Sequence, residues 1–264
     1  MSFEDLKRIE KPDFHEDMNP MSDIKHVIGI ISGKGGVGKS TVTAAIATML
    51  HKEGMSVGIL DADITGPSIP KIYGVHGPAV SDENGAYPVV AEDGTKIMSI
   101  NLILDNEETP VIWRGPVIAG AVKQFWTDII WGELDYLLVD MPPGTGDVPL
   151  TVFQSLPVDG VIIVTSPQDL VRMVVTKAYN MAKQMDIPVL GLIENFGYLS
   201  CPDCGKKIFP FGEGNVDKIA AELGIKYLGT LPLDPEVSKL SDAGEVYKRE
   251  TPEIENAMIP ILSL

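Results

Sequence analysis

The 264-residue chain has little of three things: cysteine, net positive charge and long apolar runs. It contains two cysteines, too few for the disulfide framework of a small secreted domain. It carries 21 Lys and Arg against 37 Asp and Glu, a net charge of −16, which argues against binding to nucleic acid or to an anionic membrane. No apolar run reaches the length of a membrane-spanning helix, and the first residues lack the basic and then apolar pattern of a signal peptide. We therefore expect a cytoplasmic protein that binds neither nucleic acid nor membrane.

A glycine-rich stretch at residues 33–40 carries the strongest chemical signal. It reads Gly-Lys-Gly-Gly-Val-Gly-Lys-Ser and fits the phosphate-loop pattern G-x-x-x-x-G-K-[ST]. Such a loop brings backbone N–H groups close to polyphosphate oxygens, while Lys39 neutralises phosphate charge and Ser40 binds Mg²⁺. A β-branched run precedes the loop and an apolar run of helical spacing follows it. This strand–loop–helix setting predicts a nucleotide site in place of a simple tight turn.

Apolar runs alternate with segments of helical spacing along the rest of the chain. This alternation predicts an α/β fold: a doubly wound, mostly parallel sheet of about seven strands with helices on both faces, as in a P-loop NTPase. Residues 78–100 are expected to form a β-hairpin insertion at the sheet edge because they contain Asn84-Gly85. We expect a flexible tail over residues 1–23 and one domain over residues 24–264. The expected strands are 27–32, 57–61, 97–102, 136–140, 160–165, 189–195 and 227–231, and the expected helices are about 39–53, 116–130, 147–155, 168–185, 214–223, 234–243 and 251–262.

Three aspartates stand where ligands bind in such a sheet, beyond the carboxyl ends of its strands. Asp140 ends an apolar strand and is the expected residue of the Mg²⁺ shell. Asp63 is placed to orient the attacking water, and Asp61 could aid the Mg²⁺ shell. The alternative for each of them is an ordinary helix N-cap.

Residues 33–41 resemble the deviant Walker A motif of the MinD/ParA/nitrogenase-iron-protein class of ATPases, in which a second lysine follows the first glycine. Several further stretches resemble the Mrp/ApbC family of iron–sulfur cluster carrier ATPases, and the similarity covers about residues 24–250. These stretches are Asp61-Ala62-Asp63-Ile64-Thr65-Gly66-Pro67, Val111-Ile112-Trp113-Arg114-Gly115-Pro116, Trp131-Gly132-Glu133-Leu134-Asp135, Asp140-Met141-Pro142-Pro143-Gly144-Thr145-Gly146-Asp147 and Cys201-Pro202-Asp203-Cys204-Gly205. The segment around Trp113 either faces a dimer partner or simply packs beside a helix.

The resemblance implies roles for individual residues of an ATP site. Lys34 would reach across a homodimer to the partner's nucleotide and act as an arginine finger does. Asn195 would read adenine through its amide, or else be only a turn residue at a strand end, and Pro232 would lie beside the base. The residues that would cradle the phosphates and Mg²⁺ are Gly33, Lys34, Gly35, Gly36, Val37, Gly38, Lys39, Ser40 and Thr41.

Cys201 and Cys204 form a single C-x-x-C within a segment expected at about residues 195–212. The pair supplies two thiolates, whereas tetrahedral zinc or a 4Fe–4S cluster takes four ligands, and none of the four histidines is near in sequence. A symmetric dimer would bring two such pairs together. The resemblance implies a bridging 4Fe–4S cluster at this position. Bridging zinc and redox or structural thiols are the alternatives.

The resemblance thus implies a homodimeric ATPase that carries a 4Fe–4S cluster to apo-proteins and receives it from a scaffold or cysteine desulfurase system. One alternative is a MinD/ParA-like positioning ATPase with a zinc-bridged dimer. The C-terminal residues 254–264 disfavour it, because they contain no Lys or Arg and are interrupted by Pro260. A reductase like the nitrogenase iron protein is disfavoured because such proteins use widely separated single cysteines.

Overall fold

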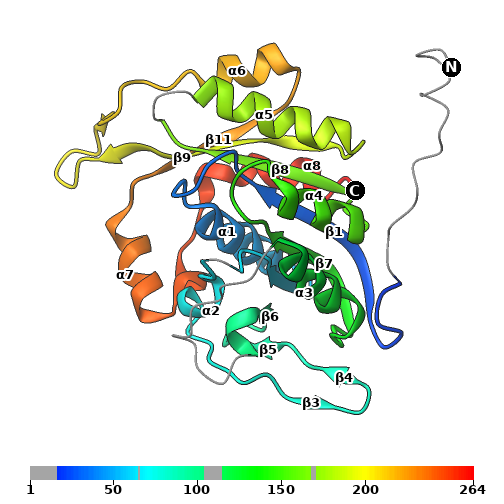
Figure 1. The fold of residues 1–264 in the computed structure, drawn as a ribbon. Coiled ribbons are helices and arrows are strands. Elements are labelled where there is room, and N and C mark those ends of the chain that lie inside the picture. The colour runs from blue at the N-terminus through cyan, green and yellow to red at the C-terminus, as the bar shows by residue number, and fades with distance from the viewer. Residues whose placement is uncertain (1–16, 65, 104–114, 168–170) are drawn as a thin grey trace, which may run out of the picture.

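The computed structural model describes residues 17–64, 66–103, 115–167 and 171–264 (Figure 1). Residues 1–16 of the expected tail, and Trp113 and Arg114 of the motif that contains them, lie outside the described residues. No described helix has both the length and the apolar character needed to cross a membrane.

The centre of the fold is a nine-stranded, mostly parallel sheet. Only the short strands β5 and β10 pair antiparallel to their neighbours, and these two account for the difference from the seven strands expected. The α/β architecture predicted from the sequence is confirmed. Across the sheet the order is β10 (Lys207–Ile208), β9 (Val189–Ser200), β8 (Gly160–Thr165), β1 (Asp23–Ile31), β7 (Glu133–Asp140), β2 (Val57–Asp61), β6 (Lys96–Ser99) and β5 (Val89–Val90), with β11 (Tyr227–Pro232) also paired to β9.

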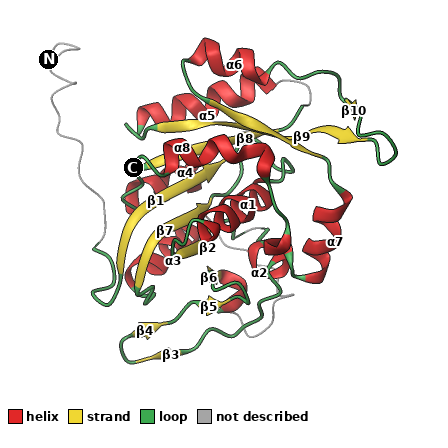
Figure 2. Cartoon of the chain, turned by 180° about the vertical axis from the view of Figure 1, so that it is seen from behind, coloured by secondary structure: helices red, strands yellow, loops and turns green. Residues whose placement is uncertain are grey.

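Helices cover both faces of this sheet (Figures 1 and 2). One face is packed by α3 (Gly115–Thr127), α4 (Asp147–Ser155), α5 (Val171–Gln184) and α6 (Val216–Leu223). The other is packed by α1 (Lys39–Lys52), α2 (Ile69–Ile72), η3 (Val246–Lys248), η4 (Pro252–Ala257) and α8 (Met258–Ile261). A short turn η2 (Ile100–Leu102) follows β6, and α7 (Pro235–Ala243) packs beside α2.

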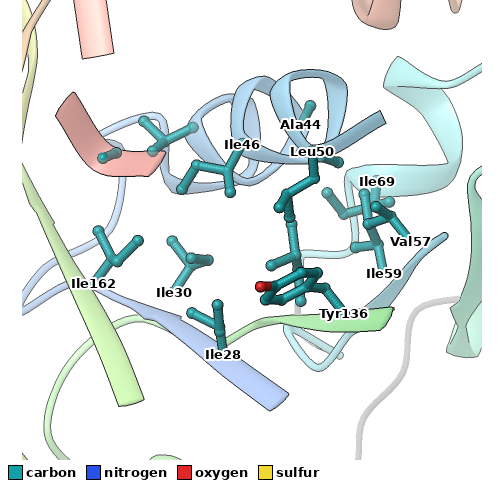
Figure 3. Close-up of a cluster of buried hydrophobic side chains, with 14 of the residues drawn as sticks. Ile28, Ile30, Ala44, Ile46, Leu50, Val57, Ile59, Ile69, Tyr136 and Ile162 are labelled. Carbon is teal, nitrogen blue, oxygen red and sulfur yellow. The ribbon is translucent and has the colours of Figure 1, made fainter. Parts of the chain in front are cut away.

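The central strand β1 is buried on both sides, as its unbroken apolar run predicts. Val27 and Ile31 belong to the core under α3–α6, whereas Ile28 and Ile30 belong to the core under α1. Figure 3 shows this second core, in which Ile46 of α1 lies over the strands. Because neighbouring residues point to opposite faces, a one-residue slip would exchange the two cores. The position of the loop that follows β1 is therefore fixed.

At the start of β1, the chain is fastened to the turn between α3 and β7. Ser22 Oγ donates to the carbonyl of Ile129 at 3.2 Å and accepts from the N–H of Trp131 at 2.8 Å. The insertion predicted for residues 78–100 is confirmed as hairpin structure, with β3 (Ser81–Asp82) pairing β4 (Gly85–Ala86) and β5 pairing β6 at the sheet edge.

Several expected boundaries were wrong. The strand expected over 97–102 ends at Ser99, and residues 100–102 form the 3₁₀ turn η2. The strand expected over 189–195 continues to Ser200, because residues after Asn195 pair with β10 and β11. The helix expected over 251–262 is a 3₁₀ segment followed by the short α8, because Ile254 leaves helical geometry between the two prolines Pro252 and Pro260.

Candidate nucleotide site and cysteine pair

The carboxylate of Asp140, at the end of β7, lies at the centre of the candidate site. It is fully buried and accepts from Lys39 Nζ at 2.6 Å and from Ser40 Oγ at 2.5 Å. Thr43 Oγ1, one helical turn after Lys39, lies 3.0 Å from the same carboxylate. Strand β7 and helix α1 thus bring together the lysine and hydroxyl of the glycine-rich motif and the aspartate predicted to accompany them.

Asp61 lies beside Asp140, because β2 and β7 pair these two residues in register. Its carboxylate accepts from the backbone N–H groups of Asp63, Ser68 and Ile69 at 3.1–3.2 Å. Burial, and next the charge of Asp140, raise the pKa of Asp61 to about 8. The Asp140 carboxylate, the Asp61 carboxyl group and the Ser40 hydroxyl form an all-oxygen donor set, which fits Mg²⁺. Asp61, predicted to aid the Mg²⁺ shell, also holds the start of α2.

The glycine-rich loop is packed tightly at Gly33 and has open space at Gly35. A Cβ at Gly33 would lie 2.5 Å from the carbonyl oxygen of Val174 in α5, whereas a Cβ at Gly35 would touch only Pro143, at 3.9 Å. Ser32 Oγ donates to the carbonyl of Lys34, and the N–H of Gly144 donates to the carbonyl of Ser32. The loop after β7 is therefore tied to the glycine-rich loop.

Lys34 and Asp63, predicted to act in hydrolysis, are both half-buried at this end of the sheet. Asp63 follows β2 directly, two residues after Asp61. Both lie on loops that follow the carboxyl ends of parallel strands, where a doubly wound fold binds its ligands.

Asn195 approaches the glycine-rich loop from β9. Its side-chain amide donates to the carbonyl of Val37 at 3.0 Å and to that of Gly38 at 3.4 Å, and its Oδ1 accepts from the N–H of Phe196. Asn195 is 2% exposed. The amide predicted to read adenine therefore bonds to the loop itself in this structure, and Asn195 lies within β9 and not at its end.

A cavity of about 330 Å³ opens between α1, β9, β11 and α7. Thr41, Asn195 and Pro232, three residues predicted to bind nucleotide, line it together with Phe196 and Arg249. The Arg249 guanidinium is held by Asp234 at 2.9 Å and by Glu253 at 3.1 Å. The cavity adjoins the start of α1, and its mixed apolar and polar walls suit a nucleoside.

Cys201 and Cys204 lie immediately after β9, in the turn that joins it to β10. Figure 2 shows this hairpin extending from the end of β9. Cys201 is half-buried and Cys204 is exposed, and the turn closes where the N–H of Gly205 donates to the carbonyl of Cys201. The N–H groups of Asp203 and Cys204, and then the Cys204 thiol, lower the pKa of Cys201 by hydrogen bonding to its sulfur. Thiolate character and access are what a soft metal ligand needs.

Within the described part of the chain, no third His, Cys, Asp or Glu side chain joins the two cysteines in a metal site. The pair alone cannot complete a four-ligand sphere.

Two residues of the site were missed by sequence reasoning. Thr43 could have been found, since residues i and i+4 share a helix face and Lys39 begins the helix. Phe196 could not, because its place against the loop depends on a backbone turn that its sequence does not signal.

Comparisons with known proteins identify relatives that are described as P-loop NTPases and as iron-sulfur cluster carriers. The sequence model of the family described as NUBPL iron-transfer P-loop NTPase matches residues 23–263. An iron-sulfur cluster carrier protein from Methanocaldococcus jannaschii is 52% identical over 231 residues, which cover 85% of this chain and 78% of that protein. One from Saccharolobus solfataricus is 44% identical over 235 residues, covering 88% of this chain and 79% of that protein.

Solved structures agree with the fold. A nucleotide-binding protein from Archaeoglobus fulgidus, determined in complex with ADP, is 44% identical with a TM-score of 0.80, covering 88% of this chain and 91% of that one. The MinD cell division protein from Aquifex aeolicus, at 24% identity, shares the fold with a TM-score of 0.63, covering 90% of this chain and 97% of that one. The resemblance drawn from the sequence motifs is confirmed, and the chain belongs to the NUBPL iron-transfer P-loop NTPase family.

Proposed function

We propose that this chain is an ATP-dependent carrier of a 4Fe–4S cluster, which two copies of the chain hold between their Cys201–Cys204 pairs and deliver to apo-proteins in the cytoplasm. The proposal is carried by two features of one chain. One is a phosphate loop with its buried Lys39–Asp140 pair, and the other is a C-x-x-C with an exposed Cys204 and hydrogen bonds that lower the pKa of Cys201.

For the ATPase half, the residues have the parts that phosphoryl transfer requires. Lys39 meets the terminal phosphates, the Gly35–Gly38 N–H groups surround them, and Asp63 orients water. Ser40, together with Asp140 and Asp61, would hold Mg²⁺, which would neutralise charge on the phosphate oxygens. Lys34 completes the site from the partner subunit, so hydrolysis depends on dimerisation.

For the carrier function, two cysteine ligands from each chain suit a cluster that must be released to another protein. Residues 202–215 are all exposed, so the thiolates of an acceptor protein would have access to a cluster held by the pair. The apolar side chains of Ile208, Phe209 and Phe211 are between 37% and 56% exposed beside the pair. A second copy that brought its own cysteines would cover part of this surface.

The test is an iron count. Protein purified without oxygen and reconstituted with iron and sulfide should hold about four irons per dimer, and should pass them to an apo-ferredoxin-type acceptor. The variant Cys201→Ala/Cys204→Ala should hold none. Its MgATP binding should match that of the parent, because no cysteine touches the phosphate loop, so its loss of iron would not be a folding failure.

The opposite outcome is equally definite. A parent protein that takes up no iron and instead holds about one zinc per dimer, on the tetrahedral four-sulfur pattern, would remove the carrier function. It would favour a positioning ATPase with a zinc-bridged dimer.

A further inference from the structure

Strand β9 is shared by the two sites. It runs over residues 189–200, contacts the glycine-rich loop at Asn195 and Phe196, and leads directly into Cys201. Both sites lie at the same end of the sheet in Figure 1. About five residues of extended chain, roughly 17 Å, separate Phe196 from Cys201.

At the loop, Asn195 fixes the direction of two peptide groups. Its amide holds the carbonyls of Val37 and Gly38. In a trans peptide, the C=O and the following N–H point in opposite directions. The N–H groups of Gly38 and Lys39 therefore point away from Asn195, and the loop cannot reorient them without disturbing β9.

Phe196 interlocks with the same loop. Its φ is +62°, and it is one of two non-glycine residues with positive φ in the described part of the chain. Such a backbone is unfavourable for a bulky residue and persists only where the surroundings impose it. A Cβ on Gly38 would lie 2.8 Å from Cζ of the Phe196 ring, so the ring closes over the glycine.

Beyond Phe196 the strand is tied continuously to the hairpin. The carbonyl of Tyr198 accepts from the N–H of Leu233 at 2.7 Å, and the N–H of Cys201 donates to the carbonyl of Lys206 at 3.0 Å. Leu199 and Ser200 pair with β10. A shift of the strand at Phe196 is therefore carried to the cysteines by backbone hydrogen bonds.

We propose that Phe196, together with Asn195, is a positioning residue that couples occupancy of the phosphate loop to the position of the Cys201–Cys204 hairpin. This inference rests on the proposed nucleotide and cysteine sites and adds the element that joins them. A nucleotide whose phosphates attract the N–H groups of the loop changes the orientation of the two carbonyls that Asn195 holds. Because the Phe196 ring packs against Gly38, Phe196 moves when that glycine moves.

The test uses the fact that the chain has only two cysteines, so alkylation by iodoacetamide reports on the hairpin alone. The rate is measured on reduced, metal-free, full-length protein without nucleotide, and with MgADP or a non-hydrolysable MgATP analogue at a concentration that saturates each variant. In the parent, nucleotide should change the rate by about fivefold or more, the usual size of coupling between sites. Phe196→Gly keeps the positive φ without strain and removes the ring, so its rate should no longer respond.

Two further variants separate coupling from general damage. Phe196→Met refills the contact over Gly38 and should restore the response. Val90→Ala removes an exposed apolar side chain from β5, at the opposite edge of the sheet, and should leave the response as in the parent.

The proposal is overturned if saturating nucleotide leaves the parent rate unchanged, or if Phe196→Gly responds as the parent does. These results are distinct from failure of the carrier function, which is read from the iron count. A parent that binds no nucleotide would overturn both proposals.

Discussion

Lys39 and Asp140 form an ion pair that is closed off from solvent. Nζ lies 2.6 Å from Oδ1, with the two side chains 6% and 0% exposed. Asp61, whose pKa is raised to about 8, is buried next to Asp140, so the lysine neutralises the Asp140 carboxylate in the folded protein as well as facing the nucleotide site. Bound phosphates would compete with Asp140 for this one cation.

Removal of this lysine should therefore destabilise the fold itself. Lys39→Met leaves a buried, unpaired carboxylate, and breaking such a pair costs about 3–5 kcal/mol of unfolding free energy. Urea unfolding without nucleotide measures it. The double variant Lys39→Met/Asp140→Asn should recover much of the loss. If Lys39→Met and Lys39→Met/Asp140→Asn were equally stable, the unpaired Asp140 carboxylate would not be what destabilises the single variant.

The glycines at 33 and 35 should respond differently to alanine. Gly33→Ala places a methyl group 2.5 Å from the Val174 carbonyl oxygen, so it should lower the melting temperature and weaken nucleotide binding together. Gly35→Ala has room and needs no unusual backbone, so it should leave the melting temperature unchanged and weaken only nucleotide binding. A Gly35→Ala protein with parental nucleotide affinity would place the phosphates elsewhere.

The turn that holds the cysteines depends on Gly205, whose φ is +70°. Gly205→Ala costs on the order of 1–2 kcal/mol in local backbone energy and should shorten the half-life of iron on the reconstituted protein. Gly212→Ala is a matched control, with φ of +84° and equally open space around its Cβ. If both variants release iron at the same rate, the geometry of the C-x-x-C turn is not what retains the metal.

Lys34 should matter for turnover and little for binding. A trans-acting cation in phosphoryl transfer is worth about 10³-fold or more in rate, so Lys34→Ala should lose that factor in ATP hydrolysis while binding MgATP. Lys71→Ala, at a largely exposed lysine, serves as the control. Parental turnover in Lys34→Ala would refute the assignment.

Glu194 should make stability dependent on pH. It is 5% exposed, Thr230 donates to its Oε2, and within the described residues its Oε1 has no partner. Burial raises the pKa of Glu194 above its ordinary 4.5. The unfolded chain therefore ionises first as pH rises, and the folded state loses stability relative to it until its own pKa is passed.

Glu194→Gln removes this titration. The stability of this variant relative to the parent, measured by urea unfolding, should not change with pH below 4.5. Above pH 4.5 it should rise, and it should level off once the pKa of Glu194 in the folded protein is passed. Glu250→Gln, at an exposed carboxyl group whose pKa is lowered by Lys52, should show no such rise. A flat Glu194→Gln difference would mean that the carboxyl group is solvated in solution.

Local sequence rules were sufficient for much of the phosphate loop. Lys39 and Ser40 have fixed spacing within a strand–loop–helix unit, and Asp140 ends a buried parallel strand, so the two segments had to meet at one edge of the sheet. Pairing of β2 with β7 then places Asp61 beside Asp140.

The contacts of β9 could not be predicted in this way. Phe196 has a left-handed backbone that neither its residue type nor its neighbours favour, and only packing against Gly38 accounts for it. The extension of β9 past Asn195 likewise depends on partners more distant in sequence, β10 and β11. Tertiary contacts decided both features against local preference.

The exposure of the cysteine hairpin has an evolutionary consequence for the proposed carrier. Residues 202–215 are exposed throughout, and the buried core resumes only at Val216. Substitutions, insertions or a graft from a relative can therefore change what the hairpin holds, and which acceptor it meets, without repacking either core. For such a carrier, selection can change the cysteine hairpin while the phosphate loop and both cores stay the same.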